Sequence, residues 1–195
     1  ADMLQRSTRT IVNQVQAMKH MVDSFRDYAR LPPANLMALD VNELLQELLV
    51  LYEASSTPIR ADLSEPLPKI KGDPAQLRQI IHNLIRNAQD ATEGLPNARI
   101  EVSTRLLGKQ VELQIADTGA GFPPEIMANA FEPYVTTKPK GTGLGLPIVK
   151  KIIEEHGGKI TLSNRETGGA EIRIVLQAAD SGGAPHTESL KSVGA

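Results

Sequence analysis

The sequence contains no cysteine and no tryptophan, and only 3% of its residues are aromatic. The absence of cysteine excludes disulfides and thiolate metal sites, and such a composition suits the cytosol. With so few aromatic side chains, the core has to be built from leucine, isoleucine, valine and alanine. No apolar run approaches the roughly 20 residues that a membrane-spanning helix needs, and the N-terminus has no signal-peptide pattern. We therefore expect a soluble chain.

An excess of charge of one sign is also missing. The chain has 21 basic and 23 acidic residues, which give a formal net charge of -2, and the two signs are interspersed. Because no basic stripe is present to neutralise a phosphate backbone, we expect no nucleic-acid partner. The 195 residues are 41% hydrophobic, enough for one core and a smaller accessory element. Both ends are polar, so we expect a fragment of a longer protein.

Residues 4–29 carry a heptad pattern in alternating steps of four and three, formed by Leu4, Thr8, Ile11, Val15, Met18, Val22, Phe25 and Ala29. This pattern predicts one long helix that packs against other helices, and Pro32–Pro33 ends it. Since one helix cannot bury its own seam, we expect a homodimer or bundle through residues 4–29. We assign 1–32 to this helix, 33–177 to a globular domain, and the small, polar residues 178–195 to a disordered tail.

The globular part combines helices with mostly antiparallel strands. Asn42 is the expected N-cap of one helix, and Asp73-Pro74 begins a strongly amphipathic second helix. Alternation of apolar and polar residues predicts strands, two of which Gly108-Lys109 joins into a hairpin. The strands are expected at 58–63, 69–71, 100–106, 111–116, 159–163 and 170–176, with a third helix at 143–156. This mixture predicts an α+β fold, a two-layer α/β sandwich with a mixed sheet and helices on one face.

The amphipathic helix carries a polar stripe opposite its apolar face. Asn83 and Asn87 are four residues apart, and Asp90 follows three residues later, so the three side chains share one side of the helix. An asparagine oxygen is a hard, neutral ligand that suits Mg²⁺. A solvated helix face explains the same pattern, so both interpretations stay open.

A second motif follows the strand 111–116, where Asp117 precedes Gly119 and Gly121. A carboxylate at this place is able to accept a hydrogen bond from an amino group, and the glycines allow the backbone to approach a flat ring. An ordinary turn after a strand is the alternative explanation.

A third motif places alternating glycines, from Gly141 to Gly145, directly before the helix 143–156. Backbone N–H groups and the positive end of the helix dipole converge there, which favours an anion. The spacing is neither a dinucleotide fingerprint nor a P-loop. A flexible hinge is the alternative. A phosphate site and a hinge are compatible with each other, because residues 122–140, including Lys138 and Lys140, would then form a mobile lid that becomes ordered when a nucleotide binds.

Taken together and in this order, the three motifs resemble the N, G1 and G2 boxes of the GHKL superfamily, which comprises gyrase, chaperone and MutL ATPases and the histidine kinases. The segment from Phe131 to Lys138 resembles the F box of the kinases. The resemblance covers about Asp40 to Leu176. It implies the Bergerat ATP-binding fold, with ATP or ADP and Mg²⁺ as the bound ligands.

The resemblance also implies residue roles. Asn87 would bind Mg²⁺, Asp117 would bind the adenine amino group, Gly121 would pack on the base, and 143–146 would wrap the phosphates. The implied nucleotide-binding residues are Asn87, Asp90, Asp117, Gly119, Gly121, Tyr134, Thr142, Gly143, Leu144, Gly145 and Leu146.

ATP-hydrolysing members of the superfamily place a glutamate four residues before the Mg-binding asparagine, as the base for water. Asn83 holds that position here, so the sequence resembles the kinase branch, in which the phosphoryl group goes to a histidine. Asn83 and Lys138 are the expected catalytic residues, and they would act by positioning and charge. The alternatives are an ATP hydrolase of this superfamily and a non-catalytic nucleotide-binding dimerisation module.

Residues 11–30 are similar to the second dimerisation helix of nitrogen-regulation, NtrY-like sensor kinases. In that family a histidine followed by Glu, and then Asn-Pro, lies on the preceding helix, and neither pair occurs before Asp40. We therefore expect a chain that binds ATP without phosphorylating itself, from the cytoplasmic part of a membrane-anchored kinase. Its implied partners are the dimerisation/phosphoacceptor helix of the full-length kinase and a response regulator receiver domain. Ala170 departs from the family, because many kinases have threonine there.

Overall fold

The structure is a computed structural model that describes residues 2–29, 31–138 and 141–179. The elements in chain order are α1 (Asp2–Ala29), β1 (Met37–Leu39), α2 (Val41–Val50), β2 (Ile59–Leu63), β3 (Ile70–Gly72), α3 (Pro74–Thr92), β4 (Ile100–Leu107), β5 (Gln110–Asp117), α4 (Pro124–Met127), α5 (Gly145–Glu155), β6 (Lys159–Asn164) and β7 (Ala170–Gln177). Five strands form one sheet in the order β2-β4-β5-β7-β6, and β1 pairs with β3 in a small second sheet. Because β2 is parallel to β4 while the other neighbours are antiparallel, the main sheet is mixed.

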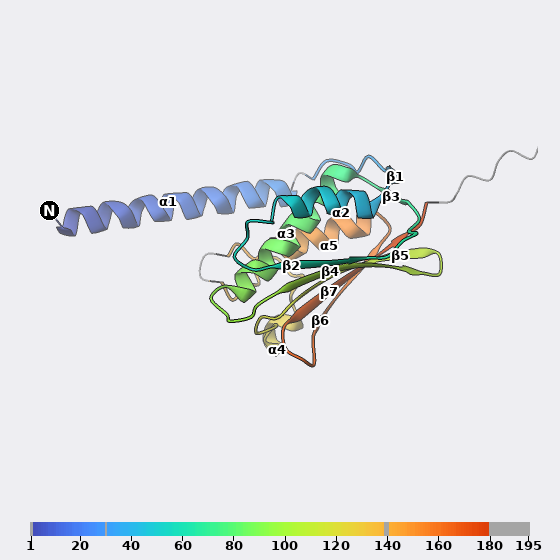
Figure 1. Cartoon of the computed structure of the whole chain (residues 1–195). Helices are drawn as coiled ribbons and strands as arrows, with labels where there is room; N and C mark the ends of the chain where they lie inside the picture. The colour runs from blue at the N-terminus through green and yellow to red at the C-terminus, as the bar shows by residue number, and fades with distance from the viewer. Residues whose placement is uncertain (1, 30, 139–140, 180–195) are drawn as a thin grey trace, which may run out of the picture.

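Helices α2, α3 and α5 cover one face of the main sheet (Figure 1). Strand β4 shows the division between the faces, since Ile100 and Val102 are buried while Glu101 and Ser103 between them are partly exposed. Helix α3 contributes a continuous apolar face made of Leu77, Ile80, Ile81, Leu84, Ile85 and Ala88. Burial of each large aliphatic side chain stabilises the fold by about 1.5–3 kcal/mol. The prediction of a two-layer α/β sandwich with a mixed sheet is confirmed.

The residue that caps the N-terminus of α2 differs from the predicted one. Asp40, not Asn42, is the N-cap, and its carboxylate accepts hydrogen bonds from the backbone N–H groups of Asn42 and Glu43. The Asn42 side chain is buried instead, where it donates to the Ser64 carbonyl and accepts from the Thr104 hydroxyl. Asn42 therefore ties α2 to the sheet.

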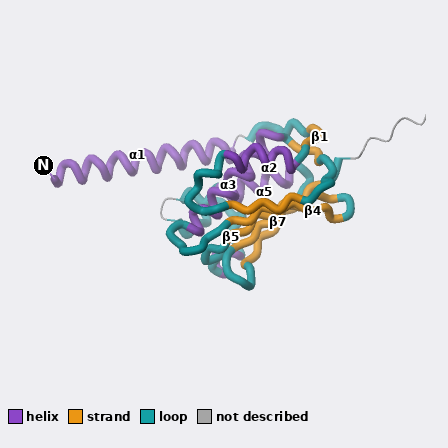
Figure 2. The backbone as a smooth tube through the Cα atoms, viewed as in Figure 1, coloured by secondary structure: helices purple, strands orange, loops and turns teal. Residues whose placement is uncertain are grey.

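Helix α1 extends away from the sandwich and contacts it at α5 (Figures 1 and 2). The heptad prediction of one long helix agrees with this element. Five of its apolar seam residues are at least half exposed, namely Ile11, Val15, Met18, Val22 and Phe25. The described part of the chain thus leaves this seam uncovered, and the predicted helical pairing stays a prediction.

The C-terminal boundary lies slightly beyond the predicted one. Strand β7 ends at Gln177, but Ala178 pairs with Ile70, and the Ala179 N–H donates to the Lys69 carbonyl at 2.7 Å. Residues 180–195 of the predicted disordered tail lie outside the described residues. Among the helices of the described ranges, none combines the length and the apolar character that crossing a membrane requires.

Asp73 joins three parts of the chain. Its carboxylate caps α3 through the N–H groups of Ala75 and Gln76, as predicted, and also accepts from the Asn35 N–H at 2.8 Å. Its own N–H donates to His156 Nε2 at 2.9 Å, at the end of α5. These bonds, first that from Asn35, hold the pKa of Asp73 below its ordinary value. The segment after α1 is thereby attached to the ends of two domain helices.

We predict that Asp73→Ala lowers the free energy of unfolding by about 1–2 kcal/mol, because α3 loses its cap and the Asn35 N–H loses its acceptor. The lowered pKa means that this contribution is present above the unfolded value of about 3.9 and is lost as the pH falls through the folded value. Urea denaturation at neutral pH and in increasingly acidic buffers measures the difference. The control is Asp62→Ala, which removes an exposed carboxylate paired with Arg105. Equal losses in both variants, or a loss that does not shrink in acid, contradict the prediction.

Candidate functional site

One cavity of about 960 Å³ opens between α3, the ends of β5 and β7, the start of α5 and the loops before it. Most residues of the predicted site line it, namely Asn83, Asn87, Asp90, Asp117, Gly121, Lys138, Thr142, Gly143, Leu144, Gly145 and Leu146. These residues come from segments that are as far apart in the sequence as residues 83 and 146. Gly119 and Tyr134 do not line the cavity.

Asp117 lines the cavity where β5 ends. It is the last residue of β5, and its side chain is buried. Oδ1 accepts hydrogen bonds from the backbone N–H groups of Gly119 at 2.8 Å and of Ala170 at 3.3 Å. Within the described part of the chain, Oδ2 accepts no hydrogen bond. One carboxylate oxygen is therefore held by the fold, and the other is available to a donor inside the cavity.

Two glycines allow the backbone to pack around Asp117. A Cβ on Gly119 would lie 2.5 Å from the Ala91 carbonyl oxygen of α3, so no larger residue fits between the turn and the helix. Gly169, at a φ of +92°, packs against the Asp117 carbonyl in the same way. Gly119 thus stands behind the cavity wall, where it positions the carboxylate through its N–H group.

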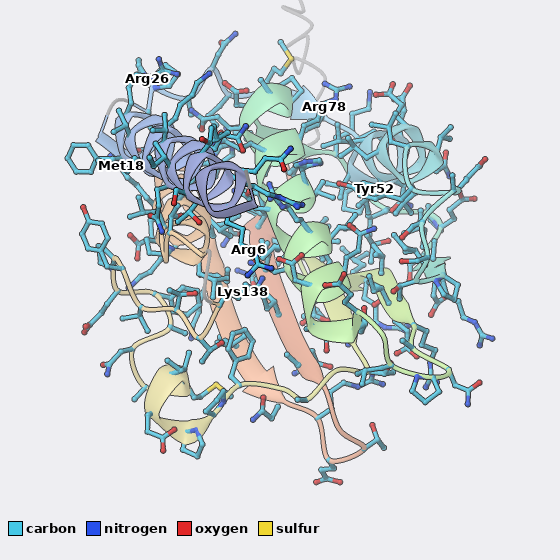
Figure 3. The ribbon with its side chains drawn as sticks, turned by 90° about the vertical axis from the view of Figure 1, so that its left-hand side faces the viewer. Arg6, Met18, Arg26, Tyr52, Arg78 and Lys138 are labelled. Carbon is cyan, nitrogen blue, oxygen red and sulfur yellow. The ribbon has the colours of Figure 1, made fainter. Side chains whose placement is uncertain are left out.

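Asn87 and Asp90 of α3 also line the cavity, and a lysine bridges them. Lys138 Nζ donates to Asn87 Oδ1 at 3.1 Å and to Asp90 Oδ2 at 2.7 Å. The start of α5 is adjacent, because a Cβ on Gly145 would lie 3.9 Å from Asn87 Nδ2. Figure 3 shows Lys138 on the side of α3 that faces α5, and Tyr52 on the side that faces α2. We call the two hydrogen bonds of Nζ the Lys138 bridge.

The oxygens of Asn87 and Asp90 fit a hard cation, since the ammonium of Lys138 already occupies them. The described residues contain no group of three or more His, Cys, Asp or Glu side chains that would hold a metal ion by themselves. A divalent cation at Asn87 would therefore take further ligands from water and from a bound anion, as Mg²⁺ does with phosphates.

The start of α5 is suited to an anion. Its N-cap, Leu144, supplies no side-chain hydrogen bond to the first N–H groups of the helix. These N–H groups and the helix dipole favour negative charge at this point. Gly143, at a φ of +66°, accepts a hydrogen bond from the Tyr134 N–H at 3.0 Å, and a Cβ there would lie 2.5 Å from the Tyr134 carbonyl carbon. The backbone of Tyr134 thus connects the segment after α4 with the residues just before α5. The ring of Tyr134 is 59% exposed.

Two features of the cavity escaped the sequence analysis. The first is an apolar wall made of Leu84, Ala88, Ile115, Ile126, Ala130, Val135, Ala170 and Ile172. Leu84, Ala88, Ile115 and Ile172 have the periodicity of ordinary core positions in the sequence. Ile126, Ala130 and Val135 lie in the segment predicted as a lid, and Ala170 was noted only as a departure from the family. The second is Arg86, which lines the cavity and makes no ion pair within the described ranges. Its place directly before Asn87, beside the polar stripe, was the available signal.

Known proteins resemble this chain in sequence and in structure. The family of histidine kinase-, DNA gyrase B- and HSP90-like ATPases matches residues 72–180. Nitrogen regulation protein NtrY of Azorhizobium caulinodans is 36% identical over 198 residues, which cover 98% of this chain and 26% of that protein. The crystal structure of full-length ShkA in complex with AMPPNP has a TM-score of 0.73 at 29% identity, covering 90% of this chain and 39% of that one.

A third similar protein is histidine kinase ThkA, in its crystal structure with the response regulator protein TrrA. Its TM-score is 0.72 at 27% identity, and the match covers 90% of this chain and 52% of that chain. The present chain spans about a quarter of the length of NtrY. The matched region contains the whole of α3, Asp117 and the start of α5, which are the parts that enclose the cavity. The chain belongs to the family of histidine kinase-, DNA gyrase B- and HSP90-like ATPases, and its relatives within that family are NtrY-like sensor histidine kinases.

Proposed function

We propose that this chain is the ATP-binding catalytic portion of a two-component sensor histidine kinase, which transfers the γ-phosphoryl group of Mg·ATP to a histidine outside the chain. One observation carries the proposal. A buried carboxylate with one free oxygen, Asp117, and the amide of Asn87 lie in the same cavity as the start of α5. This arrangement provides a hydrogen-bond acceptor, a cation ligand and an anion site for a single ligand.

The Asp117 end of the cavity suits adenine. Oδ2 would accept a hydrogen bond from the exocyclic amino group, and Gly121 would allow close approach of the backbone to the base. The apolar side chains Ile115 and Ile172 line the same cavity and suit the faces of a flat ring. AMPPNP, an adenine nucleotide, occupies the similar structure of ShkA, which supports this part of the proposal.

The opposite end suits the triphosphate and Mg²⁺. Asn87 would hold the metal ion, which when bound neutralises charge on the phosphates. The N–H groups of residues 143–146 would donate to phosphate oxygens, with Thr142 beside them. Lys138 and Arg86 would add positive charge from the cavity wall. The protein thereby orients the γ-phosphoryl group and stabilises its charge.

Asn83 favours transfer to a histidine over hydrolysis. It lines the cavity one helical turn before Asn87, where the hydrolases of the superfamily carry their glutamate. A neutral amide accepts no proton from an attacking water, so the site lacks a general base at this position. An ATP hydrolase and a non-catalytic dimerisation module remain the two rival functions.

Helix α1 would supply the contacts to other parts of the kinase. Its seam over residues 4–29, which is exposed from Ile11 to Phe25 at the five described apolar positions, is suited to a homodimer and to the dimerisation/phosphoacceptor helix of the full-length protein. A response regulator receiver domain is the proposed next partner, supported by the similar complex of ThkA with TrrA. We place the chain in the cytoplasm, where ATP is available. A membrane anchor of the parent kinase would lie in the part that this chain does not span.

The central test is nucleotide binding by isosteric variants. Asp117→Asn places an NH₂ group where Oδ2 would accept from adenine, so we expect at least a tenfold loss of AMPPNP affinity in calorimetry. Asn87→Ala should lose the part of the affinity that depends on Mg²⁺. The control is Asp62→Asn, which changes an exposed carboxylate on β2. If both site variants bind as tightly as the parent, the assignment of the site is wrong.

The reaction type is tested with the parent chain and a supplied helical hairpin that carries an acceptor histidine. We expect acid-labile phosphohistidine on the hairpin and little free phosphate without it, because Asn83 activates no water. Sustained phosphate release without an acceptor would instead identify a hydrolase. The absence of any calorimetric signal with ATP and ADP would identify the non-catalytic module.

Arg86→Ala should weaken ATP binding by about tenfold and leave adenosine binding unchanged, because a guanidinium that lines the cavity would attract the phosphates in addition to its charge interaction with Tyr52. The matched control is Arg78→Ala. Arg78 lies on the same helix but is paired with Glu47, toward α2. Calorimetric titrations with ATP, ADP and adenosine measure the dependence on phosphate number. Equal effects of the two substitutions, or an equal loss for all three ligands, contradict this role of Arg86.

A further inference from the structure

The Lys138 bridge occupies the oxygen that the proposed function assigns to the metal. Lys138 Nζ lies 3.1 Å from Asn87 Oδ1, and these residues are 51 positions apart in the chain. The backbone of Lys138 is itself held, because its N–H donates to Thr136 Oγ1 at 3.1 Å and its carbonyl accepts from the Gly141 N–H at 3.0 Å. The ammonium therefore reaches α3 from a local turn and contacts the oxygen that a metal ion at Asn87 would use.

Asn87 Oδ1 does not bind the ammonium of Lys138 and a divalent cation at the same time. Two cations that share one oxygen ligand lie only a few ångströms apart and repel each other strongly. The positive charge of Lys138 must leave Asn87 when a metal ion arrives. Nucleotide phosphates offer the nearest alternative anion, since Lys138 lines the same cavity as the start of α5.

Asp90 opposes this exchange. Its carboxylate forms the shorter arm of the bridge, at 2.7 Å, and it also lines the cavity. When the ammonium moves away, Asp90 keeps an unpaired negative charge beside the phosphates. The pair is about 40% exposed on both sides, and half-exposed ion pairs of this kind are weak enough to exchange partners readily.

We propose that Asp90 is a positioning residue that acts through Lys138: it holds the ammonium on Asn87 and so competes with Mg·nucleotide for both side chains. This inference rests on the proposed function and deepens it. It assigns opposite effects to two residues that touch each other. Asp90 weakens nucleotide binding, whereas Lys138 strengthens it through the phosphates.

The test compares Asp90→Asn and Lys138→Gln by calorimetric titration with Mg·AMPPNP. We expect Asp90→Asn to tighten binding by about three- to tenfold, and Lys138→Gln to weaken it by a similar factor. In the double variant the gain from Asp90→Asn should disappear, because no ammonium remains for Asp90 to hold. An unchanged or weaker affinity of Asp90→Asn, or a gain that persists in the double variant, overturns the proposal.

The matched control is Glu93→Gln, since Glu93 is another carboxylate of the same cavity and makes no ion pair within the described ranges. If it tightens binding as much as Asp90→Asn does, the effect is one of net charge and the proposed bridge has no part in it. A second readout uses Mn²⁺ alone, without nucleotide. Paramagnetic broadening of the Asn87 side-chain NH₂ signal should begin at lower Mn²⁺ concentration in Lys138→Gln than in the parent. Equal broadening contradicts competition at Asn87.

The outcomes separate this inference from the proposed function. If the parent chain fails to bind AMPPNP, the proposed function itself is wrong. If the parent binds AMPPNP and Asp90→Asn does not bind it more tightly, the proposed nucleotide site is retained and the proposed role of Asp90 is wrong. Thermal unfolding of each variant shows that the fold is retained, and both substitutions are near-isosteric changes of partly exposed side chains.

Discussion

The close approach of α3 to the end of β5 is the constraint on which the site depends. It is possible because Gly119 has no side chain to meet the Ala91 carbonyl. The apolar face of α3 holds the helix against the sheet, and the edge of this face, at Leu84 and Ala88, borders the cavity together with the polar stripe. The carboxylate that ends β5 and the amides of α3 consequently share one cavity, although 30 positions separate Asn87 from Asp117 in the printed sequence. The position of the helix, more than any single polar residue, makes the site.

The sequence predicted most of the fold because period-two and helical patterns were strong and clearly bounded. The Asp73-Pro74 start of α3 was correct, since its capping side chain and its neighbours in sequence act on each other. Asn42 was assigned wrongly because Asp40 and Asn42 both have capping side chains. A hydrogen bond to Thr104, 62 positions away, decides between them, and no local pattern contains that information.

The site was predicted to a lesser extent. The motif residues that act through short local geometry, such as Asp117 and the glycines before α5, do lie around the cavity. Tyr134 and Gly119 do not line the cavity, and their backbone N–H groups bond to Gly143 and Asp117, so their expected contact with a nucleotide stays a prediction. Ile172 was indistinguishable from a core residue because the same alternation buries a side chain against a helix or against a ligand. The Lys138 bridge depends on a long-range contact and left no pattern to find.

The charges of the cavity give a bound ligand one orientation. Asp117 brings negative charge to the cavity at the end of β5, whereas the start of α5 and Lys138 bring positive charge, part of which Asp90 offsets beside Lys138. A reversed triphosphate would face a buried carboxylate and leave the helix N–H groups without an anion, and both changes cost free energy. Helix α1 extends away from the domain and contacts it at α5, the helix whose start lines the cavity (Figure 1). Under the proposed function, the orientation that these charges select places the terminal phosphates near the start of α5, the helix that α1 contacts.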